Sequence, residues 1–139
     1  MNITIIDGQG GQLGTQIVKE IVAHFQNVNI TAIGTNTVAT TAMLKAGAHN
    51  AATGENAVIV ACRKADVIIG PLGIVIADSL FGEITAKMSI AISRANAIRI
   101  LLPINKCDNI IAGVTNPNTK TLIEDAILKL HNIIDNGNY

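Results

Sequence analysis

The sequence is poor in cysteine, in aromatic residues and in charge. Two cysteines, Cys62 and Cys107, among 139 residues are too few for a disulfide framework or a cysteine-based zinc site. Three aromatic residues and no tryptophan offer no platform on which nucleic-acid bases could stack. Ten basic residues balance ten acidic ones, so no net field draws the chain to nucleic acid or anionic lipid. We therefore expect neither a nucleic acid nor a membrane as its partner.

The sequence also lacks targeting and metal-binding signals. Its longest apolar tract, residues 67–77, is about half of a membrane span and is broken by two glycines and a proline. Asp7 stands where a secretory signal would be apolar, so we expect a cytoplasmic protein. The three histidines have no metal-ligand spacing, and we expect no metal. A hydrophobic fraction of 49% fits one globular domain, residues 1–135, followed by a disordered tail, residues 136–139.

Short apolar runs alternate along the chain with stretches of helical periodicity. Strands are expected at Asn2–Asp7, Val28–Ile33, Ala48–Ala52, Asp66–Gly70, Ala97–Leu102 and Asn109–Gly113. Helices are expected to begin near Gln12, Asn36, Thr53, Glu83 and Asn116. This alternation predicts an α/β fold, a three-layer doubly wound parallel sheet of Rossmann-like type in strand order 3-2-1-4-5-6. A flavodoxin-like order of five strands is the alternative if Ala48–Ala52 is a loop.

A glycine-rich loop joins the first expected strand to the first expected helix. It consists of Gly8, Gln9, Gly10, Gly11, Gln12, Leu13 and Gly14. Glycines let backbone N–H groups approach an anion, and the positive end of the helix dipole faces the same point. The loop departs from G-x-G-x-x-G because Leu13 takes the third glycine position. The pattern predicts a site for a nucleotide or another phosphorylated small molecule, with a tight turn of no further function as the alternative.

The neighbouring strand ends supply the other expected walls of this site. Thr35 and Asn36 follow the second strand, where a dinucleotide site usually places an acidic residue on the ribose. Since no acidic residue occurs between Glu20 and Glu55, the choice between NAD and NADP stays open. Gly70 and Pro71 end the fourth strand, and we expect them to form the opposite wall.

Two charged residues near the same edge of the sheet are the candidate catalytic groups. Glu83 follows the apolar connection after the fourth strand, and a carboxylate in apolar surroundings suits acid–base chemistry. Lys106 follows the fifth strand and is placed to reach an anion. The alternative for Glu83 is a position on the solvated face of a helix.

Residues 74–92 are unusually apolar for a connection between a strand and a helix. They include Ile74, Leu80 and Phe81, more than one side of a helix can bury. We therefore expect a homo-oligomer, in the simplest case a dimer, formed through this stretch. The alternative function is an interaction or structural module in which the glycine loop is only a turn.

Three segments carry a resemblance to known families. IIDGQGG at the amino end, ADVIIGPLGI and ILLPINKCDNIIAG together resemble a family of small bacterial proteins known only as a domain of unknown function. Residues 8–12 are similar to the glycine segment that opens the gamma subunits of 2-oxoacid:ferredoxin oxidoreductases. The strand–glycine–helix layout resembles NAD(P)-binding Rossmann proteins, which implies a nucleotide cofactor.

Overall fold

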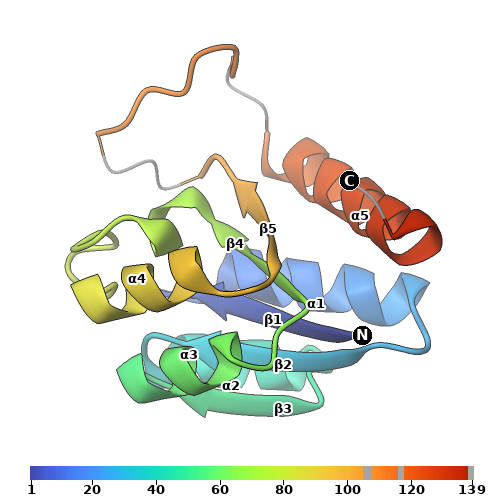
Figure 1. Cartoon of the computed structure of the whole chain (residues 1–139), viewed down its shortest axis with the longest axis horizontal. Helices are drawn as coiled ribbons and strands as arrows, with labels where there is room; N and C mark the ends of the chain where they lie inside the picture. Colours follow the sequence, from blue (N-terminus) through green and yellow to red (C-terminus); the bar gives the residue numbers. More distant parts are fainter. Residues whose placement is uncertain (105–107, 116–117, 138–139) are drawn as a thin grey trace.

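The computed structural model describes residues 1–104, 108–115 and 118–137 of the chain (Figure 1). Its strands are β1 (Asn2–Asp7), β2 (Asn29–Gly34), β3 (Asn50–Thr53), β4 (Val67–Pro71) and β5 (Ile98–Leu102). Its helices are α1 (Gln12–His24), α2 (Thr37–Lys45), α3 (Glu55–Cys62), a 3-10 turn η1 (Leu72–Val75), α4 (Ala86–Arg94) and α5 (Thr119–Asn136). None of the helices in these ranges has both the length and the apolarity to cross a bilayer.

The five strands form one parallel sheet in the order β3-β2-β1-β4-β5. The chain moves outward from β1 to β3 and then crosses back to β4 on the other side of β1. The direction of winding therefore reverses between β1 and β4, and in such sheets the crevice at the carboxyl ends of these two strands is the usual ligand site. The predicted doubly wound fold is confirmed.

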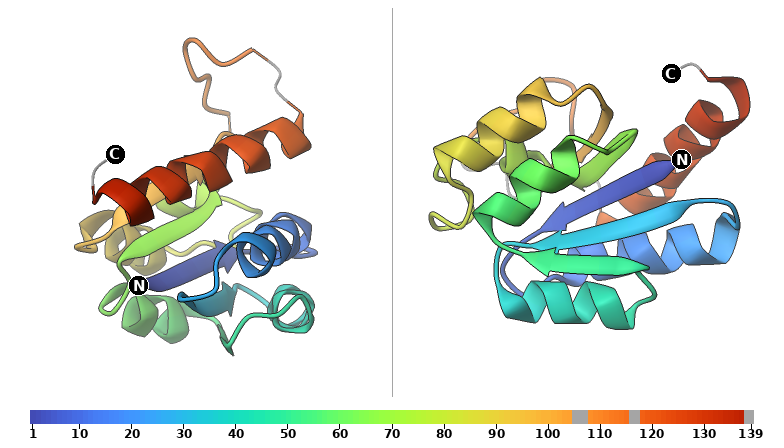
Figure 2. Two further views of the ribbon diagram at one scale, coloured as in Figure 1. Left: turned by 90° about the vertical axis from the view of Figure 1, so that its right-hand side faces the viewer. Right: turned by 60° about the horizontal axis from the view of Figure 1, so that its bottom comes forward.

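Helices cover both faces of the sheet (Figure 2). Helices α1, α2 and α5 enclose one apolar core with Ile3 and Ile5, whereas α3 and α4 enclose a second with Ile6 and Ile68. Strand β1 is buried on both faces, as its β-branched sequence predicts. Its carboxyl end at Asp7 is therefore a rigid support for the loop that follows.

Several boundaries differ from the sequence prediction by one to three residues. Strand β3 covers Asn50–Thr53 rather than Ala48–Ala52, so it begins two residues later and ends one residue later than predicted. Helix α4 begins at Ala86 rather than near Glu83, which places Glu83 in the segment before the helix. Helix α5 begins at Thr119, where the Asn118 side chain accepts a hydrogen bond from the backbone amide of Thr121 at 2.8 Å. It continues to Asn136, one residue into the predicted tail.

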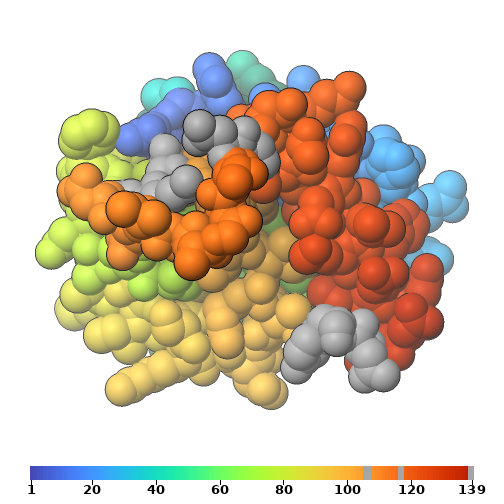
Figure 3. Space-filling model, turned by 90° about the horizontal axis from the view of Figure 1, so that it is seen from above, coloured from blue at the N-terminus to red at the C-terminus, as the bar shows by residue number. Residues whose placement is uncertain are grey.

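The predicted sixth strand, Asn109–Gly113, is not formed. Positive φ angles of 63° at Asp108 and 81° at Gly113 interrupt the extended backbone at both ends of this segment. Residues 108–115 instead form a loop over the upper face of the molecule, reaching away from α5 (Figure 3). The side chain of Ile110 is 96% exposed there, so this segment adds nothing to the described core. The prediction of a strand from this apolar run is therefore wrong.

Candidate functional site

The glycine loop makes a tight turn between β1 and α1. The backbone amide of Gly11 donates to the carbonyl of Gly8 at 2.9 Å and closes the turn. Gly11 has a φ of 69°, and a Cβ atom there would lie 2.6 Å from the Cα of Ala39. Only glycine fits this position, because the loop is left-handed there and lies directly against α2.

Asp7, at the end of β1, holds the loop from inside. Its side chain is buried and accepts hydrogen bonds from the amides of Gly8 at 2.8 Å and Gly14 at 2.7 Å. Burial raises the pKa of the Asp7 carboxyl above its ordinary value, although the hydrogen bonds from Gly14 and Gly8 oppose the shift. Two of the loop amides are thus used by the protein itself, and we assign Gly8 and Gly14 no direct contact with a ligand phosphate.

Three other amides of the loop remain available. Among the described residues, the backbone N–H groups of Gly10, Gln12 and Leu13 donate no hydrogen bond. Gln12 and Leu13 are the first residues of α1, whose unpaired amides carry the positive end of the helix dipole. These three amides are the part of the predicted anion site that the structure leaves open.

The three residues that carry the open amides line a cavity of about 430 Å³. Its walls are residues 7–13 together with Gln16, Ile104 and Thr119. Thr119 is the first residue of α5, so the amino-terminal ends of two helices meet at this cavity. No lysine or arginine lies in the described part of its wall. The site therefore offers amides, helix dipoles and neutral polar side chains to a ligand.

Glu83 reaches the other side of the loop from the segment between η1 and α4. Its carboxylate accepts hydrogen bonds from the amide of Gln9 at 2.7 Å, the hydroxyl of Thr35 at 2.5 Å and the side-chain amide of Asn36 at 3.2 Å. Burial raises the pKa of Glu83, but the hydrogen bonds from Thr35, Gln9 and Asn36 outweigh it and bring the pKa below its ordinary value. Glu83 is therefore a carboxylate at neutral pH.

Asn36 caps α2 and also bonds the glycine loop. Its side-chain oxygen accepts from the amide of Ala39 at 3.0 Å and caps α2, while its side-chain nitrogen donates to the carbonyl of Gln9 at 2.9 Å. The end of β2 is therefore tied to the glycine loop. The structure brings the predicted residues Gln9, Thr35, Asn36 and Glu83 together at one corner.

The other predicted site residues lie elsewhere. Gly70 and Pro71 are the last residues of β4, are both buried, and do not line the cavity. A Cβ atom on Gly70 would collide with the backbone oxygen of Ile6, so this glycine is required by strand packing. Lys106 lies outside the described residues.

The sequence interpretation missed four residues of the cavity wall, Asp7, Gln16, Ile104 and Thr119. Asp7 ends β1 directly before the glycine loop. Gln16 lies one helical turn after Gln12, and its spacing could have indicated a shared face. Ile104 and Thr119 come from the other end of the chain and reach the site because β5 pairs with β4 and α5 packs against α1. The described residues contain no group of three histidine, cysteine, aspartate or glutamate side chains placed to hold a metal ion.

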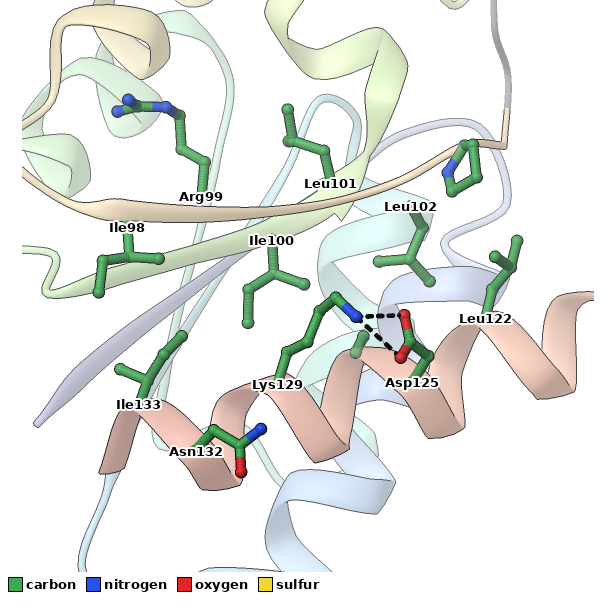
Figure 4. A pocket seen from close by; sticks show the side chains of 12 residues that line it. Ile98, Arg99, Ile100, Leu101, Leu102, Leu122, Asp125, Lys129, Asn132 and Ile133 are labelled. Atoms are coloured by element: carbon green, nitrogen blue, oxygen red, sulfur yellow. Dashed lines mark hydrogen bonds and ion pairs between the residues drawn. The ribbon is translucent and has the colours of Figure 1, made fainter. Parts of the chain in front are cut away.

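A second cavity, of about 610 Å³, lies between β5 and α5 (Figure 4). Its walls are mainly aliphatic, with Ile98, Ile100 and Ile133 among them. Lys129 and Asp125, at its margin, are bonded to each other at 2.7 Å. Arg99, the third charged residue of this wall, donates to the backbone carbonyls of Ala95 at 2.9 Å and Ala97 at 3.1 Å.

The parallel sheet, with helices on both faces, defines a doubly wound α/β protein of the Rossmann or flavodoxin type. The chain belongs to the family described as "Domain of unknown function (DUF3842)", which matches residues 2–135. A search of the curated proteins finds no match. The solved structures include a similar chain, titled a dodecameric FMN-dependent Ubix-like decarboxylase from Escherichia coli O157:H7. It is 14% identical with a TM-score of 0.46, and the match covers 94% of each chain.

Proposed function

We propose that this chain binds a phosphorylated small molecule of the nucleotide class, with a phosphate group on the free amides of Gly10, Gln12 and Leu13. The observation that carries the proposal is that the amides of these three residues make no hydrogen bond within the described part of the chain, and that the same residues line a cavity. Backbone polar groups in folded proteins are nearly always paired, and the open amides at a helix amino terminus favour an anion. Phosphate oxygens are the acceptors that such a site suits best.

The surroundings of the cavity support a nucleotide rather than free phosphate alone. The space of about 430 Å³ exceeds what one phosphate group fills, and Gln16 and Thr119 offer further polar contacts. The proposed class includes both NAD and NADP, because the side chains of Thr35 and Asn36 after β2 are polar and neutral. The predicted involvement of Lys106 stays a prediction.

The proposal is tested by thermal unfolding with NAD, NADP, ADP-ribose, flavin mononucleotide, nucleoside diphosphates and inorganic phosphate. A ligand present at 100 times its Kd adds about 2.7 kcal/mol of stability, or about 8–12 °C in Tm for a domain of this size. Gly10→Ala is expected to weaken the binding about tenfold, because its methyl group enters open space beside the free amides. Calorimetric titration with the best ligand measures the change.

Gly54→Ala is the matched control. Gly54 has a φ of 96° and is absent from the cavity wall, so an alanine there costs stability and leaves the affinity unchanged. Gly10 has no such positive φ, and Gly10→Ala should keep the Tm of the free protein within about 2 °C. A panel without any stabilising ligand, or full affinity in Gly10→Ala, would contradict the proposal.

Our second proposal is a homo-oligomer formed through residues 74–92, and it rests on fewer apolar side chains than the sequence indicated. Ile74, Leu80 and Ile84 are buried in the chain's own second core, so they are not available to a partner. Phe81 in this segment is fully exposed and Ile90 is about half exposed, so these are the large apolar side chains left for an interface. We expect Phe81→Glu to reduce the molar mass measured by light scattering to that of a single chain. An unchanged mass would exclude this segment as the interface.

A further inference from the structure

Three hydrogen-bond donors from different parts of the chain converge on the carboxylate of Glu83. They are the backbone amide of Gln9, the hydroxyl of Thr35 and the side-chain amide of Asn36. We infer that these donors form a second anion site, which the Glu83 carboxylate occupies in this structure and which the second phosphate of a diphosphate ligand takes when it binds. This inference rests on the proposed function, since the first phosphate sits on the free amides.

The contacts of Glu83 are those of a bound anion. One carboxylate oxygen, Oε2, accepts from both Gln9 and Thr35, and these bonds are as short as charge-assisted hydrogen bonds usually are. No ion pair joins Glu83 to a lysine, arginine or histidine of the described residues. Neutral donors alone hold the charge, as they would hold a phosphate oxygen.

The second site adjoins the first through Gln9, which bonds Glu83 and also lines the cavity. Gln9 and Gly10 are consecutive, so the amide that bonds Glu83 stands next to the first of the free amides. Gly8 leaves room for an anion at this point, because a Cβ atom there would lie 2.5 Å from Oε2 of Glu83 and 2.7 Å from the hydroxyl of Thr35. Two linked phosphates can therefore extend along the loop, with one on each site.

Glu83 can leave the donors without rearrangement of the fold. Leu80 and Ile84 on either side of it are buried and anchor the segment in the second core. The side chain of Glu83 is only partly buried, so rotation about its own bonds carries the carboxylate into water. The energetic cost of this exchange is the loss of three hydrogen bonds, which the incoming phosphate replaces.

The test compares inorganic phosphate with pyrophosphate by calorimetric titration of the full chain and of Glu83→Gln. The glutamine side chain has one acceptor oxygen fewer and turns an N–H group toward the three donors, so it competes less well with an incoming phosphate for them. The affinity for pyrophosphate relative to that for phosphate should therefore be about tenfold higher in Glu83→Gln than in the parent. Asp78→Asn is the matched control, because it removes one charge from the same segment at an exposed side chain. It should leave the ratio of the two affinities unchanged.

Each outcome decides between the proposals. Equal gains for phosphate and pyrophosphate, or weaker pyrophosphate binding in Glu83→Gln, would overturn the second site while the first stands. Failure of phosphate and pyrophosphate to bind either protein while a nucleotide of the panel still binds would overturn this inference alone. Failure of every ligand of the panel, phosphate and pyrophosphate included, would overturn the proposed function and this inference with it. Adding Thr35→Val to Glu83→Gln removes one donor and should cancel the gain.

A measurement on the unmodified chain covers the case in which Glu83→Gln does not fold. In amide NMR spectra, phosphate should shift the resonances of Gly10, Gln12 and Leu13, and pyrophosphate should shift that of Gln9 as well. A Gln9 resonance that responds to both anions alike, or to neither, would contradict the displacement of Glu83.

Discussion

Replacing Gly70 by alanine is expected to destabilise the fold by about 3 kcal/mol or more, which lowers the Tm of a domain of this size by about 9–12 °C. Gly70 lies in β4 beside the central strand, and a Cβ atom would collide with the backbone oxygen of Ile6 and lie 3.0 Å from the Cδ1 of Ile74. A backbone oxygen in a buried strand cannot move aside as a flexible side chain can. Urea denaturation of the parent and the variant measures the difference.

Gly10→Ala is the control for Gly70→Ala, because it adds the same methyl group at a glycine with open space around it. Gly10 has open space around it, and the nearest atom to an added Cβ is the Cγ of Gln12 at 4.0 Å. We expect Gly10→Ala to change binding with little loss of stability, and Gly70→Ala to change stability. A Gly70→Ala protein as stable as the parent would show that β1 and β4 are not packed as closely as described.

The glycines at this edge of the sheet have different roles, and the sequence alone does not separate them. Gly11 is required by its left-handed backbone and by Ala39, Gly70 by Ile6, and only Gly10 stands in open space next to unpaired amides. In the sequence all of them indicated close approach of a ligand. The distinction depends on which backbone atoms lie beside each glycine after folding.

Most of the sheet could be predicted because β1, β2, β4 and β5 are short runs rich in isoleucine or valine that end at, or directly before, a glycine or a proline. The first five strands are confirmed within a few residues, and their alternation with helices leads to the observed order. Residues 109–113 have the same composition, but the left-handed backbone of Asp108 cannot be read from an apolar run. A local apolar run therefore predicts a strand only where the residues on either side of it keep an extended backbone.

The candidate site could be predicted in part. The strand–glycine–helix order located the loop, and the position directly after the second strand indicated Thr35 and Asn36, because both signals are local. The contact between Glu83 and Gln9 joins residues 74 positions apart and depends on how the segment after β4 folds back over β1 and β2. The use of the Gly8 and Gly14 amides by Asp7 likewise depends on the side-chain position and not on a motif.

Asp7→Asn is expected to lower the free energy of unfolding by about 2–4 kcal/mol at pH 7. The two carboxylate oxygens of Asp7 each accept one backbone amide, from Gly8 and from Gly14. Asparagine keeps one acceptor and turns an N–H group toward the second amide, so a buried donor loses its partner. Urea denaturation at pH 7 measures the loss, and Asp66→Asn, an exposed carboxylate that bonds the amide of Asn2, is the control.

The size of this loss should depend on pH in a defined direction. Because burial raises the pKa of Asp7 in the folded chain, folding takes up a proton at this group. Its contribution to stability is fully present below about pH 3.9, the ordinary pKa of aspartate, and is lost as the pH rises through the raised pKa. Asparagine does not titrate, so the difference in stability between the parent and Asp7→Asn should widen as the pH falls from 7 toward 4. A difference that narrows instead would mean that the amides of Gly8 and Gly14 outweigh burial, and that Asp7 anchors the loop most strongly as a carboxylate.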